Sequence, residues 1–212
     1  MQPGAQSSVM PGVAKEPMLL LDTTGSMNYP ISANDPTPRK DTVREAISLV
    51  VDALAAEDSQ AEHEKGGGGL RTVTFADGQA FDLEDLNPSN LAQKWAGIRW
   101  AGGTRIVPGW NKLIDTYQDE FGGEPPDQRP MLLALVITDG EADDTDRFTQ
   151  ALSGAGGGVY IVVALVGYGA EHDRALTAYQ TIASANAHVK VITFASETNP
   201  QTIADALVRM IA

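Results

Sequence analysis

Two almost continuously apolar segments, Met131 to Thr138 (MLLALVIT) and Val159 to Val166 (VYIVVALV), constrain the fold more than any other feature of the sequence. A strand with one face in water alternates apolar and polar residues, whereas a strand that is covered on both faces is apolar throughout. Both segments are far shorter than the roughly 20 residues that a membrane-spanning helix needs. They are therefore predicted to be central strands of a sheet that has helices on both sides.

The rest of the chain alternates between strand patterns and helix patterns. The other predicted strands are Met18 to Asp22, Leu70 to Phe75 and Val189 to Phe194, and the predicted helices lie near 43–55, 86–97, 110–121, 144–152, 171–184 and 200–211. Such alternation predicts an α/β fold with a mostly parallel central sheet and right-handed crossovers. The turn signal ADG at 76–78 adds one short antiparallel strand at the edge of that sheet.

Capping patterns predict where two of these helices begin. Thr42 and Glu45 have the spacing of a capping box at the start of the first helix. Asn87 is the predicted N-cap of the second helix, because Pro88 follows it and proline suits the first helical position.

Length and charge limit the domain organisation and the partners. The 212-residue chain suits one domain, predicted over residues 17–212 after a flexible tail over residues 1–16. Its 15 basic and 28 acidic residues give a net charge of −13, which repels phosphate groups and argues against nucleic-acid or anionic-membrane partners. The tail has neither the basic region nor the apolar region of a secretory signal, so we expect a cytoplasmic protein without membrane insertion. The oligomeric state is left open.

Small oxygen-bearing side chains gather in three segments at the predicted carboxyl edge of the sheet. Asp22, Thr24 and Ser26 stand at alternate positions in DTTGSM, Thr104 follows two glycines in AGGT, and Asp139 ends a central strand in ITDGE. Each segment alone is typical of a turn or a helix cap. In open α/β sheets, however, ligands bind at the carboxyl ends of the strands. Carboxylates and hydroxyls are hard oxygen ligands that suit Mg²⁺, so together the segments favour a metal site.

This combination resembles the von Willebrand factor A (vWA) domain family, whose Rossmann-like fold carries a metal-ion-dependent adhesion site (MIDAS). The MIDAS joins an Asp-x-Ser-x-Ser motif to a separate threonine and a separate aspartate. Asp22, Thr24 and Ser26 match the first part with threonine in place of the first serine, and Thr104 and Asp139 match the others. The resemblance covers about residues 17–212.

The resemblance implies how a metal would be held. Thr24 and Ser26 would bind it directly, Asp22 and Asp139 directly or through water, and Thr104 would join or leave as the site changes state. Mg²⁺ is the expected ion, with Mn²⁺ and Ca²⁺ as alternatives. In many relatives an acidic side chain of a protein partner completes the coordination, which implies a non-enzymatic protein-binding module.

The loop from Met27 to Arg39 is long for an α/β connection. Asn28 and Tyr29 in this loop are therefore candidates to contact a partner beside the metal. Arg105 is a third candidate because it follows Thr104 and is positively charged. For each of them, an ordinary surface or packing role is an open alternative.

A magnesium-dependent phosphotransfer or hydrolase enzyme is the main alternative function, because such enzymes also place an aspartate after the first strand of an α/β sheet. Thr24 stands where a haloacid dehalogenase-like phosphatase has its second aspartate, and no phosphate-binding G-x-x-x-x-G-K-[ST] loop occurs. An EF-hand starting at Asp139 is excluded, because Asp144 and Gln150 replace the required glycine and glutamate. The acidic residues from Glu141 onwards are expected to form a solvated loop and a first helical turn.

Overall fold

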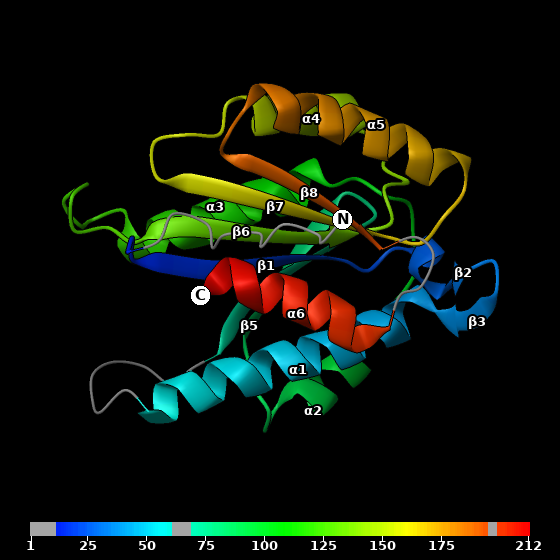
Figure 1. The fold of residues 1–212 in the computed structure, drawn as a ribbon, viewed down its shortest axis with the longest axis horizontal. Coiled ribbons are helices and arrows are strands. Elements are labelled where there is room, and N and C mark those ends of the chain that lie inside the picture. The colour runs from blue at the N-terminus through cyan, green and yellow to red at the C-terminus, as the bar shows by residue number, and fades with distance from the viewer. Residues whose placement is uncertain (1–11, 61–68, 195–198) are drawn as a thin grey trace, which may run out of the picture.

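A computed structural model of the chain describes residues 12–60, 69–194 and 199–212. It confirms the predicted α/β fold, with a six-stranded sheet in the order β5-β4-β1-β6-β7-β8 (Figure 1). The strands of this sheet are β1 (Lys15–Asp22), β4 (Leu70–Ala76), β5 (Gln79–Leu86), β6 (Met131–Thr138), β7 (Val159–Val166) and β8 (Val189–Phe194). Neighbouring strands are parallel except for β4 and β5, which confirms the antiparallel edge strand.

Helices cover both faces of the sheet (Figure 1). One face packs against α1 (Arg39–Gln60), α2 (Leu91–Ala96) and α6 (Pro200–Ile211), and the other against α3 (Val107–Phe121), α4 (Thr145–Ser153) and α5 (Ala170–Ala185). Side chains alternate across a strand, so Leu19 and Leu21 of β1 enter the first core while Met18 and Leu20 enter the second. The all-apolar strands β6 and β7 contribute to both cores, as their sequences predicted.

The turn between β4 and β5 explains the antiparallel edge. Asp77 and Gly78 both have positive φ, 53° and 71°, as a two-residue hairpin turn requires at both central positions. The turn reverses the chain directly after β4, and β5 then pairs along the whole length of that strand.

The segment between β1 and α1 is more ordered in its backbone than the predicted loop. It contains a 3₁₀ helix, η1 (Gly25–Asn28), and a small hairpin of β2 (Pro30–Ser32) and β3 (Asp35–Pro38). The backbone N–H of Arg39 donates to the carbonyl of Tyr29 at 2.9 Å, which closes the hairpin onto the start of α1.

Both predicted helix starts are wrong by about one turn. The first helix begins at Arg39, so Thr42 lies inside it, because the hairpin delivers the chain directly into the helix. The second begins at Leu91. The side chain of Asn87 instead accepts hydrogen bonds from the backbone N–H groups of Ser89 and Asn90, at 3.0 and 3.1 Å, and so stabilises a turn that precedes the helix.

At the N-terminus, β1 begins at Lys15, two residues before the predicted domain boundary. Residues 1–11 of the predicted tail lie outside the described residues. Across the described parts of the chain, none of the helices has the length and apolar character needed to cross a membrane.

Candidate metal centre

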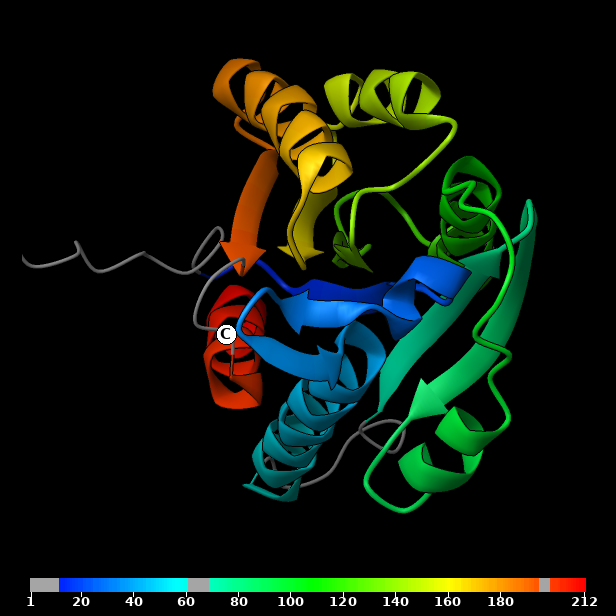
Figure 2. The ribbon, with the colours of Figure 1, turned by 90° about the vertical axis from the view of Figure 1, so that its right-hand side faces the viewer.

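The carboxyl ends of the parallel strands, with η1 and the β2–β3 hairpin beside them, form the edge that faces the viewer in Figure 2. Asp22 ends β1 there and is fully buried. Its Oδ1 accepts hydrogen bonds from the backbone N–H of Thr24 at 2.9 Å and from the Thr24 hydroxyl at 2.6 Å. Its Oδ2 accepts from the hydroxyl of Thr138, the last residue of the neighbouring strand β6, at 2.7 Å. Both oxygens of the carboxylate are therefore held in fixed positions.

The hydroxyls of Thr24 and Ser26 lie next to each other, 3.1 Å apart. Adjacent ligand oxygens of Mg²⁺ are about 3 Å apart when each Mg–O distance is about 2.1 Å in an octahedron. Thr24 is buried, whereas Ser26 is partly exposed at the start of η1. The structure thus brings Asp22, Thr24 and Ser26 into one cluster whose hydroxyl spacing fits a small hard cation.

The loop that carries Thr104 is bonded to this cluster. The carbonyl of Gly102 accepts from the backbone N–H of Gly25 at 3.1 Å. The backbone N–H of Gly103 donates to Asp77 Oδ1 at 2.8 Å. Gly102 has a φ of +97°, and an added Cβ would lie 2.4 Å from the Asp77 carboxyl carbon, so only glycine fits there. Thr104 itself is buried, and its carbonyl accepts from the backbone N–H of Asp143 at 2.9 Å.

Asp139 follows β6 and is fully buried beside a residue that the sequence analysis did not select. The Arg39 guanidinium donates through Nη1 to Asp139 Oδ2 at 2.7 Å, and Arg39 is only 3% exposed. The same nitrogen lies 3.3 Å from Glu141 Oε1, and Nη2 donates to the carbonyl of Tyr168 at 3.3 Å. An arginine 100 residues away from its aspartate carries no motif, so the sequence alone gave no signal for this ion pair.

The neighbourhood of Arg39 is shaped around its guanidinium. Gly167 has a φ of +100°, and a Cβ at this position would lie 2.4 Å from Arg39 Nε. On another side, the centroid of the Tyr29 ring lies 5.8 Å from Arg39 Cζ, within the range of a cation–π contact. Nε is buried without a hydrogen-bond acceptor among the described residues.

Burial and like charge dominate the electrostatics of the centre. Burial in the sheet edge, reinforced by repulsion from Asp139, raises the pKa of Asp22 to about 7, although the hydrogen bonds from Thr24 and Thr138 oppose this shift. Two buried carboxylates therefore lie within electrostatic reach of each other, and Arg39 offsets only one of the two formal charges. A divalent cation would more than offset the other charge.

The donor set decides which metal the centre suits. Within the described ranges, no three His, Cys, Asp or Glu side chains cluster closely enough to hold a metal between them. A metal here would depend on hydroxyl oxygens together with the carboxylates. This chemistry suits Mg²⁺, Mn²⁺ or Ca²⁺ better than a soft transition metal.

The three predicted partner-contacting residues have different surroundings. The side-chain amide of Asn28 donates to the carbonyls of Gly25 and Trp100, at 3.1 and 3.0 Å, and so ties η1 to the loop before Thr104. Tyr29 is 55% exposed above Arg39. Arg105 is exposed and packs next to Gly78, so it lies at the β4–β5 end of the carboxyl edge of the sheet.

The acidic segment forms the expected loop and, at Asp146, the expected first turn of a helix, but two of its residues are only partly exposed and make specific contacts. Glu141 contacts Arg39, as described above. The carboxylate of Asp144 accepts from the backbone N–H groups of Ile106 and Val107, at 2.9 and 3.0 Å, and so caps the start of α3. These contacts join the loop after Asp139 to the loop after Thr104.

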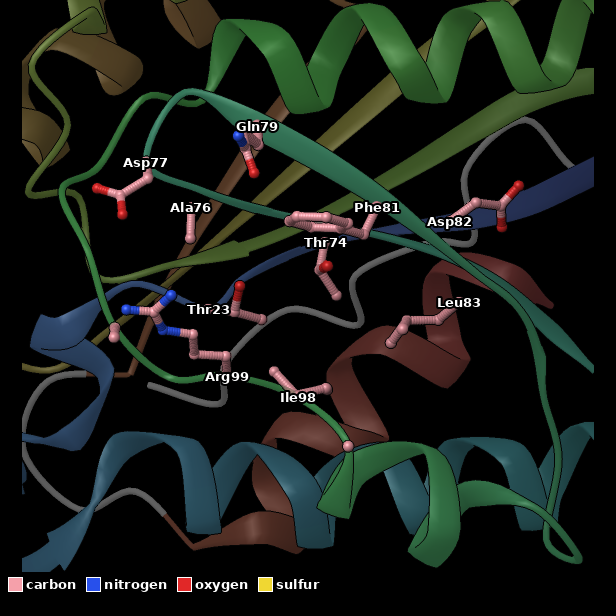
Figure 3. A pocket seen from close by; sticks show the side chains of 12 residues that line it. Thr23, Thr74, Ala76, Asp77, Gln79, Phe81, Asp82, Leu83, Ile98 and Arg99 are labelled. Carbon is pink, nitrogen blue, oxygen red and sulfur yellow. The ribbon is translucent and has the colours of Figure 1, made fainter.

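A pocket of about 400 Å³ adjoins the centre (Figure 3). It lies between the β4–β5 hairpin and the segment 97–101, and Thr23, Phe81, Leu83 and Arg99 are among the residues that line it. Thr23 stands between two of the candidate metal ligands in the sequence, and Phe81 is 53% exposed. An apolar surface is therefore available beside the candidate metal centre.

No model of a known protein family and no curated protein matches this sequence. Among solved structures, PilB minor pilin from Streptococcus sanguinis superposes with a TM-score of 0.62 at 12% identity, over 95% of this chain and 61% of the pilin. An aerotolerance-related membrane protein from Bacteroides fragilis NCTC 9343 gives 0.61 at 20% identity, over 94% and 98% of the two chains. The SpRpn10 VWA domain gives 0.59 at 12% identity, over 94% and 98%. The chain thus has the vWA fold, and it spans less than two thirds of the pilin.

Proposed function

We propose that the chain is a vWA family member that binds a divalent cation, most readily Mg²⁺, and uses it to bind a protein partner. The ligands would be Asp22, Thr24, Ser26, Thr104 and Asp139. The observation that carries the proposal is the cluster at the end of β1, where a buried carboxylate and two hydroxyls 3.1 Å apart meet, with a second buried carboxylate, Asp139, within electrostatic reach. Such a cluster concentrates hard oxygens and negative charge in one place, which is what a small divalent cation requires.

The metal would supply a Lewis-acidic position for a carboxylate oxygen from an Asp or Glu side chain of the partner. The protein's own residues prepare that position. Thr138 and Thr24 orient the Asp22 carboxylate, and Asn28 fixes η1 against the loop that leads to Thr104. Three of the proposed ligands are neutral hydroxyls, so the loaded centre keeps more positive charge for an incoming acid than an all-carboxylate centre would.

Features around the centre would then select the partner. The net charge of −13 repels acidic segments in general, so an acid has to reach the metal itself to gain from it. The exposed Phe81 in the adjoining pocket offers apolar contact to a side chain that neighbours this acid. The partner segment expected to bind best combines one acidic residue with an apolar neighbour.

A magnesium-dependent hydrolase or phosphotransferase is not favoured. Such an enzyme usually needs a second acid or a lysine beside its nucleophile, whereas Thr24 stands where a second aspartate would be and no lysine adjoins the AGGT or ITDGE segments. If the protein hydrolysed a phosphate ester in the presence of magnesium and Asp22→Asn abolished this activity, the enzyme would be favoured over the protein-binding module.

The test is a Mn²⁺ titration followed by electron paramagnetic resonance, with Mg²⁺ as competitor. Ser26→Ala removes one proposed ligand from a partly exposed position, and Ser184→Ala removes a comparable hydroxyl from the exposed face of α5. We expect saturable binding by the wild type and by Ser184→Ala, and binding at least about tenfold weaker by Ser26→Ala, equivalent to about 1.4 kcal/mol. Absence of saturable binding by the wild type would contradict the proposal.

The open position on the metal is tested separately with acetate as the simplest carboxylate. Water-proton relaxation reports water molecules bound to protein-held Mn²⁺, and acetate should lower the relaxation rate by displacing one of them. An equal concentration of chloride controls for ionic strength. A relaxation rate that acetate leaves unchanged would contradict an acid-accepting metal.

A further inference from the structure

Arg39 holds a positive charge inside the centre that is proposed to bind a metal. We propose that Arg39 is a tethered cation that balances Asp139 in the metal-free protein, and that a divalent cation binds at the expense of the Arg39–Asp139 ion pair. This inference rests on the proposed metal site and concerns how its occupancy is controlled.

Arg39 lies between three loops at the carboxyl edge of the sheet. The Arg39 guanidinium contacts segments that follow three strands of the sheet: Asp139 after β6, the carbonyl of Tyr168 after β7, and the carbonyl of Ser26 in η1, the last at 3.5 Å. Two of these segments carry proposed metal ligands. The guanidinium therefore lies within the ring of loops that would surround the ion, and it uses an oxygen of one proposed ligand.

The Arg39–Asp139 ion pair is buried. The Arg39 and Asp139 side chains are 3% and 0% exposed, so water screens their interaction with a nearby ion only weakly. A divalent cation at Asp22 and Asp139 would repel the guanidinium and would compete with it for Asp139. Metal affinity and the strength of the Arg39–Asp139 pair are therefore coupled, and each weakens the other.

The guanidinium of Arg39 has a second acidic partner. Glu141 Oε1 lies 3.3 Å from Nη1, and the Glu141 side chain is 28% exposed. Arg39 can give up Asp139 and keep Glu141, so displacement does not leave its charge buried and unpaired. The ring of Tyr29 lies over the guanidinium and is more than half exposed, so it lies between the guanidinium and solvent.

The space around the guanidinium is shaped to fit it, but the guanidinium is not fully hydrogen-bonded there. Gly167 leaves room for Nε where any side chain would collide with it. Nε nevertheless has no acceptor within the described part of the chain. A buried guanidinium with an unmet donor is held less tightly than a fully bonded one, which favours exchange with a metal ion.

Arg39→Met tests the proposal because methionine removes the charge and adds no oxygen ligand. The matched control is Arg71→Met, which breaks another Arg–Asp pair and removes the same net charge. Arg71 lies on β4 opposite Met18 of β1. Met18 is four strand positions, or roughly 13 Å, from Asp22 along β1. We expect Mn²⁺ to bind Arg39→Met at least about tenfold more tightly than the wild type, and Arg71→Met and Arg39→Lys within about threefold of it. Equal or weaker binding by Arg39→Met would overturn the proposal.

A second measurement uses the wild type, in case Arg39→Met does not fold without metal. The Nε–Hε resonance of Arg39, identified by its loss in Arg39→Lys, reports the surroundings of the guanidinium. It should shift during a Mg²⁺ titration with the same midpoint as metal binding. A resonance that is unchanged at saturating Mg²⁺ would overturn the proposal.

The outcomes separate this inference from the function on which it rests. If neither the wild type nor any variant binds metal, the proposed function and the inference both fail. If the wild type and Arg39→Met bind Mn²⁺ equally well, the metal-binding function stands and only the inference fails. If Arg39→Met binds and the wild type does not, Arg39 controls occupancy and the wild-type metal function fails.

Discussion

Two arginine–aspartate pairs in this protein have the same contact distance and very different surroundings. Arg39–Asp139 and Arg71–Asp82 are each joined at 2.7 Å. The side chains of the first pair are 3% and 0% exposed, and those of the second are 27% and 24% exposed. Exposed pairs typically contribute about 0–1 kcal/mol, whereas removing one partner of a buried pair typically costs about 3–5 kcal/mol. The burial of a pair, more than its distance, sets what it does for the fold.

The pairs also differ in what they connect. Arg71 and Asp82 belong to the two strands of one hairpin and are 11 residues apart. Arg39 and Asp139 are 100 residues apart and join the start of α1 to the end of β6. The partly exposed pair therefore reinforces a contact that the β4–β5 turn already enforces. The buried pair holds together two loops of the candidate metal centre.

The largest expected effect comes from removing one partner of each pair. In EDTA, Asp139→Ala leaves Glu141 as the one acidic partner of the buried guanidinium among the described residues, and we expect a loss of about 3 kcal/mol in the free energy of unfolding, the lower end for a broken buried pair because Glu141 still offsets part of the charge. Asp82→Ala should lose less than about 1 kcal/mol. Urea denaturation of the two variants and the wild type measures both values. Similar losses at the two positions would show that burial does not distinguish the pairs.

The second prediction concerns pH. The pKa of Asp22 is raised to about 7, so between about pH 4 and pH 7 the folded protein binds more protons than the unfolded chain. The metal-free protein should therefore lose stability as the pH rises through this window, by at most about 4 kcal/mol from Asp22. Asp22→Asn should remove this part of the loss, and Asp82→Asn should keep it. Urea denaturation in EDTA between pH 4 and pH 8 measures the slope.

Glu16, at the other end of β1, supplies an internal control for the pH experiment. Burial raises its pKa to about 7 as well, with repulsion from Glu120 and Asp85 adding to the shift. Mg²⁺ should restore stability above pH 7 in Glu16→Gln, because Asp22 remains available as a ligand, but not in Asp22→Asn. Equal restoration in the two variants would place the metal elsewhere.

The fold was predictable from the sequence because its signals are local. The uninterrupted apolar segments β6 and β7 identified the centre of the sheet, and the Asp77–Gly78 turn identified the edge strand. The helix starts at Arg39 and Leu91 were missed because the β2–β3 hairpin and the turn held by Asn87 decide them, and neither follows from a capping motif.

The centre was predictable only in part, for a related reason. Alternate positions after one strand are enough to suggest that Asp22, Thr24 and Ser26 converge. Arg39 has no such signal, since its contact with Asp139 arises from the way the hairpin places the start of α1. A tertiary ion pair between distant segments is not encoded in any window of the sequence, so Arg39 was overlooked although it contacts a proposed metal ligand.

The space around the buried Arg39–Asp139 pair depends on Gly167. Gly167→Ala places a Cβ 2.4 Å from Arg39 Nε at a φ of +100°, and should cost about 1–3 kcal/mol of stability. Gly156 is the control, because an added Cβ there has no neighbour within 4 Å. Thermal unfolding of the two alanine variants measures the difference. A Gly167→Ala protein as stable as Gly156→Ala would show that the space around the guanidinium is not constrained.

The smallest expected effect lies where the buried pair meets solvent. Tyr29 and Phe81 are aromatic residues of similar exposure, 55% and 53%, but Arg39 lies beneath the ring of Tyr29. Tyr29→Leu should cost about 0.5–1 kcal/mol in EDTA through the lost cation–π contact, and Phe81→Leu should cost less. In saturating Mg²⁺ the cost of Tyr29→Leu should change, because a guanidinium that has left Asp139 no longer lies in the same place under the ring. Chemical denaturation with and without Mg²⁺ measures this difference, and a cost that is the same in both conditions would mean that Arg39 keeps its position when the metal binds.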